Sequence, residues 1–378
     1  MKTIKTLTFD VKEDGWETSR GFIMRQIAMP ELDEKSNVAD AGSVILKMKY
    51  AGVCGSDKGI WSRKAFKDLI HGSLAREDKT TRILGHELLG EVVQVGSAVK
   101  NVVVGNIVSG DSHVTCGECY QCKIGENNVC TNEAILGISM NGIFAEYVKL
   151  PAKNLFVIDA EKIRPEIAAI MDPFGNAVHA VSKTEVRSKT VAVFGAGPIG
   201  LFAILLLRHF GAAKIIAIDI NQENLNIAKE LGCDEIILLN DNKAAVAKIW
   251  ELTQGVGADI TMEMAGPESS VINCLESARR GGHVILFGVK DGDFTIPTFS
   301  KIITKGLTLH GVIGRRIFET WNTAAAVLSD KSNGVQEKMW DIILKKGGGT
   351  VVPFAEYNKE AFEKVMNKNP KVIFKFNA

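Results

Sequence analysis

The stretch that decides the fold is TVAVFGAGPIGLFAILLLRHFGAAKIIAID, residues 190–219. An apolar, β-branched run is followed by a glycine turn, GAGPIG at 195–200, then by a strongly apolar helical stretch and a second apolar run that ends in Asp219. The order of strand, glycine turn, helix, strand and acid is the fingerprint of a dinucleotide-binding unit. A glycine-rich turn that binds nothing is the structural alternative.

Each glycine of this turn has a physical role. Gly195 permits the tight turn, Gly197 lets backbone N–H groups approach a diphosphate, and Gly200 lets the helix lie close to the strand. The diphosphate is expected at the helix N-terminus, where unpaired N–H donors and the macrodipole favour negative charge. Pro198 and Ile199 complete the cofactor-binding turn.

Asp219 predicts which dinucleotide is bound. Its carboxylate would accept hydrogen bonds from the adenosine ribose hydroxyls and would repel a 2′-phosphate. Residues 220–222, Ile-Asn-Gln, supply no cation to hold such a phosphate. NAD is therefore expected rather than NADP.

Length and charge exclude several classes of protein. A chain of 378 residues is expected to form two domains, and 45 Lys and Arg against 44 Asp and Glu argue against nucleic acid or an anionic membrane as main partner. No apolar run approaches the length of a membrane span. The segment Met1–Lys12 lacks the apolar core of a signal peptide, which predicts a cytoplasmic protein.

Cysteine spacing predicts a metal site. Four of the seven cysteines are Cys116, Cys119, Cys122 and Cys130, a spacing that can close a tetrahedron of thiolates around a structural zinc. An iron–sulfur cluster is the alternative, although the ferredoxin pattern has three residues before its last Cys and a Pro after it, whereas Thr131 follows here. A redox-active Cys pair is a further alternative.

The first part of the chain carries candidate residues at the ends of predicted strands. Alternation over Val44–Tyr50 predicts a strand that ends near Cys54, and the sequence Gly85-His86-Glu87 enters another strand. Neighbouring side chains on a regular strand point to opposite faces, so His86 and Glu87 could serve one metal only at an irregular turn, which Gly85 allows. Taken singly, Cys54 would be interpreted as a buried structural thiol and His86 as a core histidine.

The centre of the chain alternates between strands and helices. Beyond residues 190–219, strands are predicted at 235–239, 259–265, 283–288 and 307–312, and helices at 222–231, 244–253 and 269–277. This order predicts a doubly wound parallel sheet. Elsewhere we expect a helix or loop over the site at 61–82, a strand at 142–148, a turn entering a helix at 172–179, and short apolar runs that rejoin the first domain at 351–378.

Together these motifs resemble a known family, the zinc-dependent medium-chain alcohol and polyol dehydrogenases. The resemblance rests on Gly85-His86-Glu87, the four-cysteine segment and the GAGPIG turn, and it covers nearly the whole chain. Three longer stretches resemble the threonine dehydrogenase branch: SGDSHVTCG at 109–117, DPFGNAVH at 172–179 and GRRIFETW at 314–321.

The resemblance implies a fold, two cofactors and a set of site residues. The fold is a GroES-like, partly open β-barrel catalytic domain at 1–176 and 317–378 with a Rossmann domain at 177–316, and the protein is a homo-oligomer, tetramer or dimer. The cofactors are NAD and two zinc ions per chain, one of them catalytic. Its ligands would be Cys54, His86, Asp172 and an exchangeable Glu87, with Ser56 starting a proton relay, His113 near the substrate and Arg315 at the cofactor.

The implied activity is the transfer of hydride from a secondary alcohol to NAD, with L-threonine oxidised to 2-amino-3-ketobutyrate. The alternatives are a polyol, a sugar or another secondary alcohol as substrate, and a non-catalytic, zinc-stabilised NAD-binding protein. Ser56 could instead cap a turn, Asp172 could be an N-cap before Pro173, and His113 could be a surface histidine.

Three features depart from the branch. Gly59 stands where a His is usual, Asp172 stands where a Glu is expected, and the stretch from Cys54 to His86 is several residues longer. Within that stretch Lys64, Lys67 and Arg76 could bind a substrate carboxylate or form a solvated face.

Overall fold

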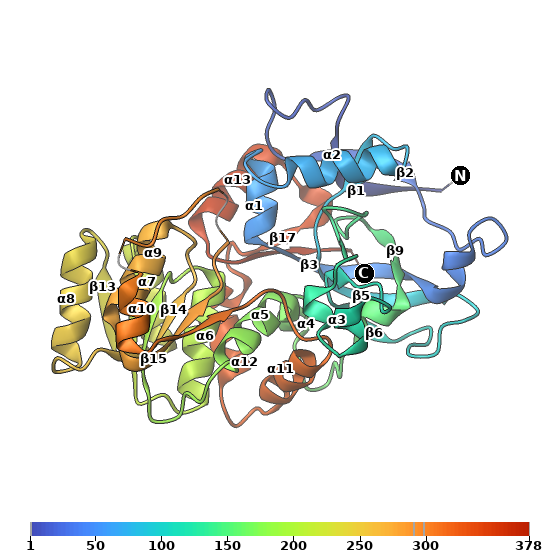
Figure 1. Ribbon diagram of the computed structural model, residues 1–378. Helices are drawn as coiled ribbons and strands as arrows, with labels where there is room; N and C mark the ends of the chain where they lie inside the picture. Colours follow the sequence, from blue (N-terminus) through green and yellow to red (C-terminus); the bar gives the residue numbers. More distant parts are fainter. Residues whose placement is uncertain (1, 290–291, 298, 378) are drawn as a thin grey trace. The chain divides into compact units, whose positions relative to one another are not determined.

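The computed structural model describes residues 2–289, 292–297 and 299–377 (Figure 1). Contacts divide the chain into two compact units: unit 1 is 1–173, 316–330 and 339–378, and unit 2 is 174–315 and 331–338. Met1 and Ala378, the ends of the predicted catalytic domain, lie outside the described residues. Helix α5 (Met171–Val181) begins in unit 1 and continues into unit 2.

Unit 1 is built on a large sheet that gathers distant parts of the chain. Its strand order is β10-β6-β5-β3-β18-β17, and β9 pairs with β3. All its neighbours are antiparallel except β17 and β18. The strands are β3 (Ser43–Val53), β5 (Glu87–Val95), β6 (Ile107–Gly110), β9 (Tyr147–Pro151), β10 (Leu155–Val157), β17 (Val351–Pro353) and β18 (Val372–Lys375). The 351–378 segment thus places β18 directly beside β3.

Two smaller sheets complete unit 1. One has the order β2-β1-β4 and the other pairs β7 with β8. Aromatic side chains pack against one another in the core, as where Phe144 meets Phe374 edge-on at 5.3 Å and Phe22 meets Trp61 at 4.9 Å. The strands are β1 (Thr3–Asp10), β2 (Ile23–Ala28), β4 (Thr81–Ile83), β7 (His113–Val114) and β8 (Ala134–Ile135).

The helices of unit 1 are short, apart from three of ten or eleven residues. They are α1 (Gly55–Trp61), α2 (Lys67–Arg76), α3 (Tyr120–Lys123), α4 (Pro165–Ala168), α11 (Glu319–Ser329) and α13 (Lys359–Lys368). The 61–82 segment, predicted as helix or loop, holds the end of α1, all of α2 and the start of β4. Buried Arg82 fixes α2 by donating to Glu77 Oε1 at 2.6 Å and to Ser73 Oγ at 2.9 Å.

The predicted strand at 142–148 is wrong over most of its length. Only its last two residues belong to a strand, β9, and Ala145 forms an isolated bridge with Thr6. The segment instead bonds irregularly to residues 83–85: the Gly142 N–H donates to Ile83 O at 2.8 Å, and the N–H groups of Ile143 and Phe144 both donate to Leu84 O, at 3.0 and 2.8 Å. Two successive N–H groups that share one carbonyl do not follow the alternation of an antiparallel ladder.

Unit 2 contains the predicted doubly wound sheet. All six strands are parallel, in the order β13-β12-β11-β14-β15-β16. The strands are β11 (Thr190–Phe194), β12 (Lys214–Asp219), β13 (Glu235–Leu238), β14 (Ala258–Glu263), β15 (Ala278–Leu286) and β16 (Thr308–Gly311). The order reverses between β11 and β14, and this switch point is where such sheets bind ligands.

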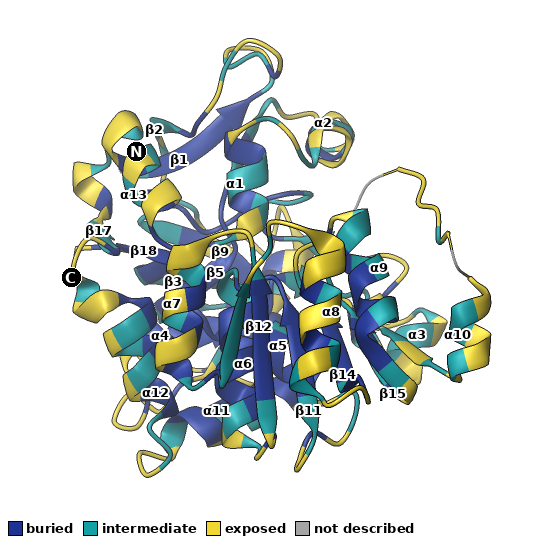
Figure 2. Cartoon of the chain, turned by 90° about the vertical axis from the view of Figure 1, so that its left-hand side faces the viewer, coloured by how far each residue is buried: buried dark blue, intermediate teal, exposed yellow. Residues whose placement is uncertain are grey.

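Helices cover this sheet. Right-handed crossovers place α6 and α7 on one face and α8, α9 and α10 on the other, and Figure 2 shows the central strands buried and the outer helix faces exposed. The helices are α6 (Pro198–His209), α7 (Gln222–Leu231), α8 (Asn242–Leu252), α9 (Glu268–Ser277), α10 (Ser300–Lys305) and α12 (Val335–Lys338). Among the described residues, no helix combines the length and the apolar character needed to cross a bilayer.

Candidate metal and cofactor sites

Cys54, His86 and Glu87 form one group whose potential ligand atoms all lie within 4.8 Å of one another. Cys54 lies between the end of β3 and the start of α1, and Glu87 is the first residue of β5. Gly85 makes the irregular turn before them: its φ is +84°, and a Cβ there would lie 2.3 Å from the Phe144 ring. This turn lets both His86 and Glu87 face Cys54.

Asp57 faces the His86 ring. The His86 Nδ1 atom lies 3.7 Å from Asp57 Oδ1, and Nε2 lies 3.3 Å from Ser56 Oγ. Although burial lowers the pKa of His86, the negative charges of Asp57, Cys54 and Asp172 raise that pKa to about 10. Burial raises the pKa of Asp57. The sequence interpretation missed Asp57, although an acid three residues after a candidate ligand and inside a helix was the available signal.

Glu87 forms a fully buried ion pair with Lys371. Lys371 Nζ donates to Glu87 Oε1 at 2.5 Å and to Val53 O at 3.0 Å. The close approach depends on Gly52, because a Cβ there would lie 1.9 Å from Glu87 Oε2. The sequence interpretation also missed Lys371, which lies 284 residues from its partner.

Asp172 is not an N-cap. It lies inside the first turn of α5, and its Oδ1 accepts the backbone N–H of Ser112 at 3.0 Å. It is outside the group of Cys54, His86 and Glu87, although its charge contributes to the raised pKa of His86. Asp172 is therefore close enough to act electrostatically on the metal-ligand group.

His113 is held at the cysteine segment. Its Nδ1 atom lies 2.6 Å from Glu133 Oε2, and its backbone N–H donates to Asp111 Oδ1 at 2.9 Å. Asp111 in turn accepts the indole N–H of buried Trp321 at 2.8 Å. These contacts connect two of the longer stretches that carry the family resemblance, 109–117 and 314–321.

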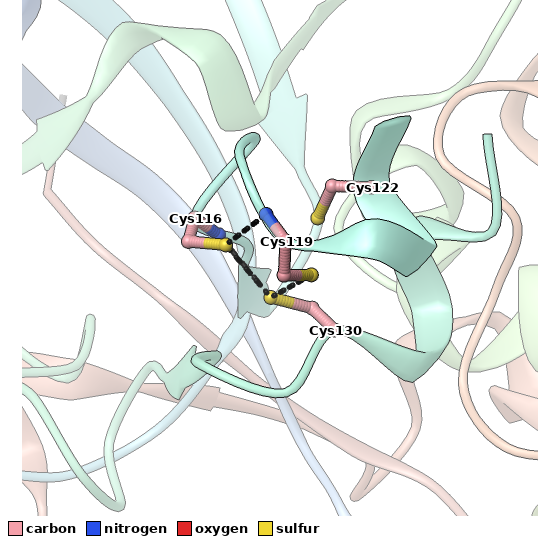
Figure 3. A group of neighbouring side chains, drawn as sticks. All are labelled: Cys116, Cys119, Cys122 and Cys130. Carbon is pink, nitrogen blue, oxygen red and sulfur yellow. Dashed lines mark hydrogen bonds between the residues drawn. The ribbon is translucent and has the colours of Figure 1, made fainter. Parts of the chain in front are cut away.

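The four cysteines converge (Figure 3). Their sulfur atoms lie within 4.8 Å of one another, with Cys119 Sγ 3.8 Å and Cys116 Sγ 3.5 Å from Cys130 Sγ. The backbone N–H of Cys116 donates to Cys130 Sγ, and that of Cys119 donates to Cys116 Sγ, both at 3.3 Å. Backbone N–H donors lower the pKa of Cys119 to about 6, whereas burial raises that of Cys122 to about 12.

The donor sets fit zinc. Tetrahedral thiolate coordination with Zn–S bonds of about 2.3 Å requires sulfurs about 3.8 Å apart, close to the separations found here. A redox pair would engage only two of the four sulfurs. The Cys54 group offers sulfur, imidazole and carboxylate donors, which zinc binds, and its histidine has the adjacent carboxylate that metal-bound imidazoles commonly use.

The glycine turn leaves space for a diphosphate. Gly195 has a φ of +100°, a Cβ on Gly200 would lie 1.9 Å from Gly195 O, and a Cβ on Gly197 would meet nothing within 4 Å. Gly197 is also the N-cap of α6, whose first residue is Pro198. A phosphate can therefore approach the backbone at Gly197 and the helix N-terminus.

Asp219 and Arg315 have defined contacts within unit 2. Asp219 accepts the backbone N–H of Ala196 at 2.5 Å and that of Asn221 at 2.8 Å, so its carboxylate lies against the glycine turn. Arg315 is buried, and its Nη1 donates to Asn176 Oδ1 at 2.9 Å.

Comparisons with known proteins identify the family of this chain. Residues 40–160 match the alcohol dehydrogenase GroES-like domain, and residues 198–330 match the zinc-binding dehydrogenase family. L-threonine 3-dehydrogenase of Bacillus subtilis (strain 168) is 36% identical over 324 residues, which cover 84% of this chain and 86% of that protein.

Solved structures share the fold. An alcohol dehydrogenase from Thermus sp. ATN1 has a TM-score of 0.81 at 25% identity and covers 99% of this chain and 100% of its own. An alcohol dehydrogenase from E. coli CFT073, described as short chain and complexed with NADH, has a TM-score of 0.77 at 25% identity and covers all of both chains. The predicted fold class is therefore confirmed, and the chain belongs to the zinc-dependent medium-chain dehydrogenases as an NAD-dependent alcohol oxidoreductase.

Proposed function

We propose that this enzyme oxidises the secondary alcohol of L-threonine to 2-amino-3-ketobutyrate with NAD. The observation that carries the proposal is the 36% identity to an L-threonine 3-dehydrogenase over 84% of the chain. Buried hydrogen bonds also join the three stretches at 109–117, 172–179 and 314–321: the Ser112 N–H donates to Asp172 Oδ1, and the Trp321 indole N–H donates to Asp111 Oδ2.

The residues proposed to hold two zinc ions fall into two sets. Cys54, His86 and Asp172, with Glu87 as an exchangeable fourth ligand, would hold the catalytic ion, and Cys116, Cys119, Cys122 and Cys130 the structural one. A bound catalytic zinc supplies Lewis acidity that lowers the pKa of a substrate hydroxyl.

The chain's own residues would orient the metal ligands and accept the substrate proton. The Asp57 carboxylate, 3.7 Å from His86 Nδ1, would hold the ring in one orientation, and Lys371 donates a hydrogen bond to the Glu87 carboxylate. Ser56 Oγ, 3.3 Å from His86 Nε2, is the proposed first acceptor of the substrate proton. The relay beyond Ser56 must run through a group other than residue 59, which is glycine. His113 is the proposed contact for the substrate.

The cofactor is proposed to lie along the carboxyl edge of the parallel sheet. The glycine turn would hold the diphosphate, through Gly195, Gly197, Pro198, Ile199 and Gly200. Asp219 would bind the adenosine ribose. Arg315 is assigned to the cofactor because of its position in the family motif. We assign the catalytic zinc-binding domain to 1–176 and 317–378 and the NAD-binding domain to 177–316. We also propose a cytoplasmic homo-oligomer, a tetramer or dimer, which light scattering on the purified protein would measure.

The test is NAD reduction by zinc-loaded protein with L-threonine, beside sorbitol, butane-2,3-diol and glucose. We expect turnover on threonine to exceed the others clearly. Cys54→Ser should abolish turnover while NAD binding persists, and Cys233→Ser, a buried thiol bonded to Glu235 O in unit 2, is the matched control that should remain active. Turnover on a diol or sugar without turnover on threonine would contradict the proposal.

One observation favours the second candidate, a polyol or simple secondary alcohol. Of the cations that could bind a threonine carboxylate within the long 61–82 segment, Lys67 is already paired with Glu17 at 2.5 Å. Lys64→Ala and Arg76→Ala should each raise the KM for threonine if those side chains bind the carboxylate. Unchanged KM values in both variants would favour a substrate without one.

A further inference from the structure

Glu263, the last residue of β14, is a fully buried carboxylate that neither the zinc sites nor the glycine turn uses. Its partners are backbone N–H groups: Oε1 accepts from Ala265 at 2.8 Å and from Gly266 at 2.7 Å, and Oε2 accepts from Gly288 at 3.1 Å. Burying a carboxylate is unfavourable unless such charge-assisted hydrogen bonds compensate. Glu263 therefore fixes the backbone of two separate loops.

These loops lie at the ligand-binding edge of the sheet. Glu263 is in register with Phe194, the last residue of β11, and with Leu286, the last residue of β15. The strand order reverses between β11 and β14, so Glu263 stands at the switch point, where doubly wound sheets bind dinucleotides across their two halves. The half formed by β11–β13 carries the glycine turn and Asp219, which leaves the half formed by β14–β16 for the nicotinamide end.

The loop after β14 and the loop after β15 are in close backbone contact. A Cβ on Gly288 would lie 2.3 Å from Gly266 N and 2.4 Å from Glu263 Oε2. A Cβ on Gly195 would lie 2.9 Å from the Ala265 side chain, so the loop after β14 also packs on the glycine turn. Any movement of the Glu263 carboxylate must therefore shift backbone beside the cofactor.

We propose that Glu263 is a positioning residue for the nicotinamide half of NAD. Its carboxylate presets the backbone at 264–266 and at 288 in the geometry that receives the nicotinamide nucleotide, so this ordering is complete before the cofactor arrives. The inference rests on the cofactor site proposed above and does not depend on which alcohol is the substrate.

The test compares NADH with ADP by titration calorimetry on the zinc-loaded protein. Glu263→Gln keeps the shape of the side chain but replaces one acceptor oxygen by an NH₂ donor. That donor would face the backbone N–H donors of one of the two loops. We expect NADH to bind roughly tenfold more weakly, as for the loss of one charge-assisted hydrogen bond, while ADP affinity changes by less than about twofold. ADP fills the adenosine half and lacks the nicotinamide nucleotide.

Asp259→Asn is the matched control. Asp259 lies on the same strand at its other end, where it accepts from Thr190 N and Arg279 Nε, and its change should leave both affinities intact. Equal losses of NADH and ADP binding in Glu263→Gln, or no loss of either, would overturn the proposal.

If Glu263→Gln does not fold, Gly288→Ala tests the same contact by placing a methyl group against the carboxylate. We expect the same selective loss of NADH affinity, and unchanged NADH binding by folded Gly288→Ala would overturn the inference. Because binding needs no substrate, normal NADH binding without threonine turnover would count against the proposed substrate alone.

Discussion

Lys371 donates to the Glu87 carboxylate at 2.5 Å, and both side chains are almost completely buried, at 1% and 0% exposure. The pair joins the start of β5 to the residue before β18, and it fixes one of the proposed zinc ligands. An ion pair at this depth is costly to break, because the remaining charge has no water to solvate it.

Lys371→Met should therefore lower the free energy of unfolding by about 3–5 kcal/mol, measured by urea denaturation. The exposed pair of Lys67 and Glu17, also 2.5 Å apart, provides the control: Lys67→Met should cost less than about 1 kcal/mol. Equal losses in the two variants would contradict a special role for the buried pair.

Asp57→Asn should weaken catalytic zinc binding by about 10- to 100-fold, because the carboxylate beside His86 Nδ1 sets the orientation of the ring. Competition with a chromophoric chelator measures the affinity. Asp159→Asn, on an exposed carboxylate paired with Lys162, should leave the affinity unchanged. Unaltered zinc binding in Asp57→Asn would show that His86 is oriented by other contacts.

Cys119→Ser should reduce the zinc content from two ions per chain to about one and lower the thermal midpoint, because a four-thiolate site stabilises its segment only when complete. Metal analysis of the purified variant, with Cys233→Ser as control, measures this directly. Fully active wild-type protein with well under one zinc per chain would refute both zinc assignments.

We expect Asp10 to contribute to the free energy of unfolding in a way that is lost at low pH. Burial raises the pKa of Asp10, but hydrogen bonds from the Thr81 and Thr80 hydroxyls and from the Lys12 and Glu13 N–H groups outweigh it and lower the pKa from 3.8 to about 2. A depressed folded-state pKa stabilises the protein above pH 3.8, and that stabilisation is lost as the pH falls towards 2. Wild type should therefore exceed Asp10→Asn in unfolding free energy at pH 7, with the gap closing between about pH 4 and 2. A gap that does not vary with pH would assign the effect to packing.

Asp219→Ala should weaken NAD binding by roughly tenfold and relax the bias against NADP, because it removes the acceptor for the ribose and the charge that repels a 2′-phosphate. The ratio of kcat/KM for NAD and NADP is the readout. Glu223→Ala, in the first turn of α7, is the control. An unchanged ratio would place the ribose contact elsewhere.

Local signals made parts of unit 2 predictable from the sequence. The second apolar run ends at Asp219 in the structure, as predicted. The bounds predicted for α7 also agree, since Asn221 accepts N–H groups at its start and Gly232, with a φ of +113°, ends it. The predicted strand at 259–265 ends at Glu263 in the structure, because that side chain turns the backbone after it by accepting N–H groups from Ala265 and Gly266.

Contacts between distant residues were not predictable in the same way. Cys54, His86 and Glu87 could be proposed from their strand ends and from Gly85, but their supporting residues could not. Lys371 meets Glu87 only because β18 inserts next to β3, a strand pairing that leaves no local pattern. Asp57 was within reach of sequence reasoning, since its position in the helix after Cys54 turns it towards His86.

The place of β18 has a consequence for synthesis on the ribosome. β18 separates β3 from β17 in the large sheet, although more than 300 residues lie between β3 and β18 in the chain. Most of unit 2, at 174–315, is contiguous and emerges before β18 is made. The parallel sheet can therefore form before the large sheet is complete. During that interval the Glu87 carboxylate lacks Lys371, and the edge of β3 at 50–53, which β18 later covers, is open to chaperones and to neighbouring nascent chains.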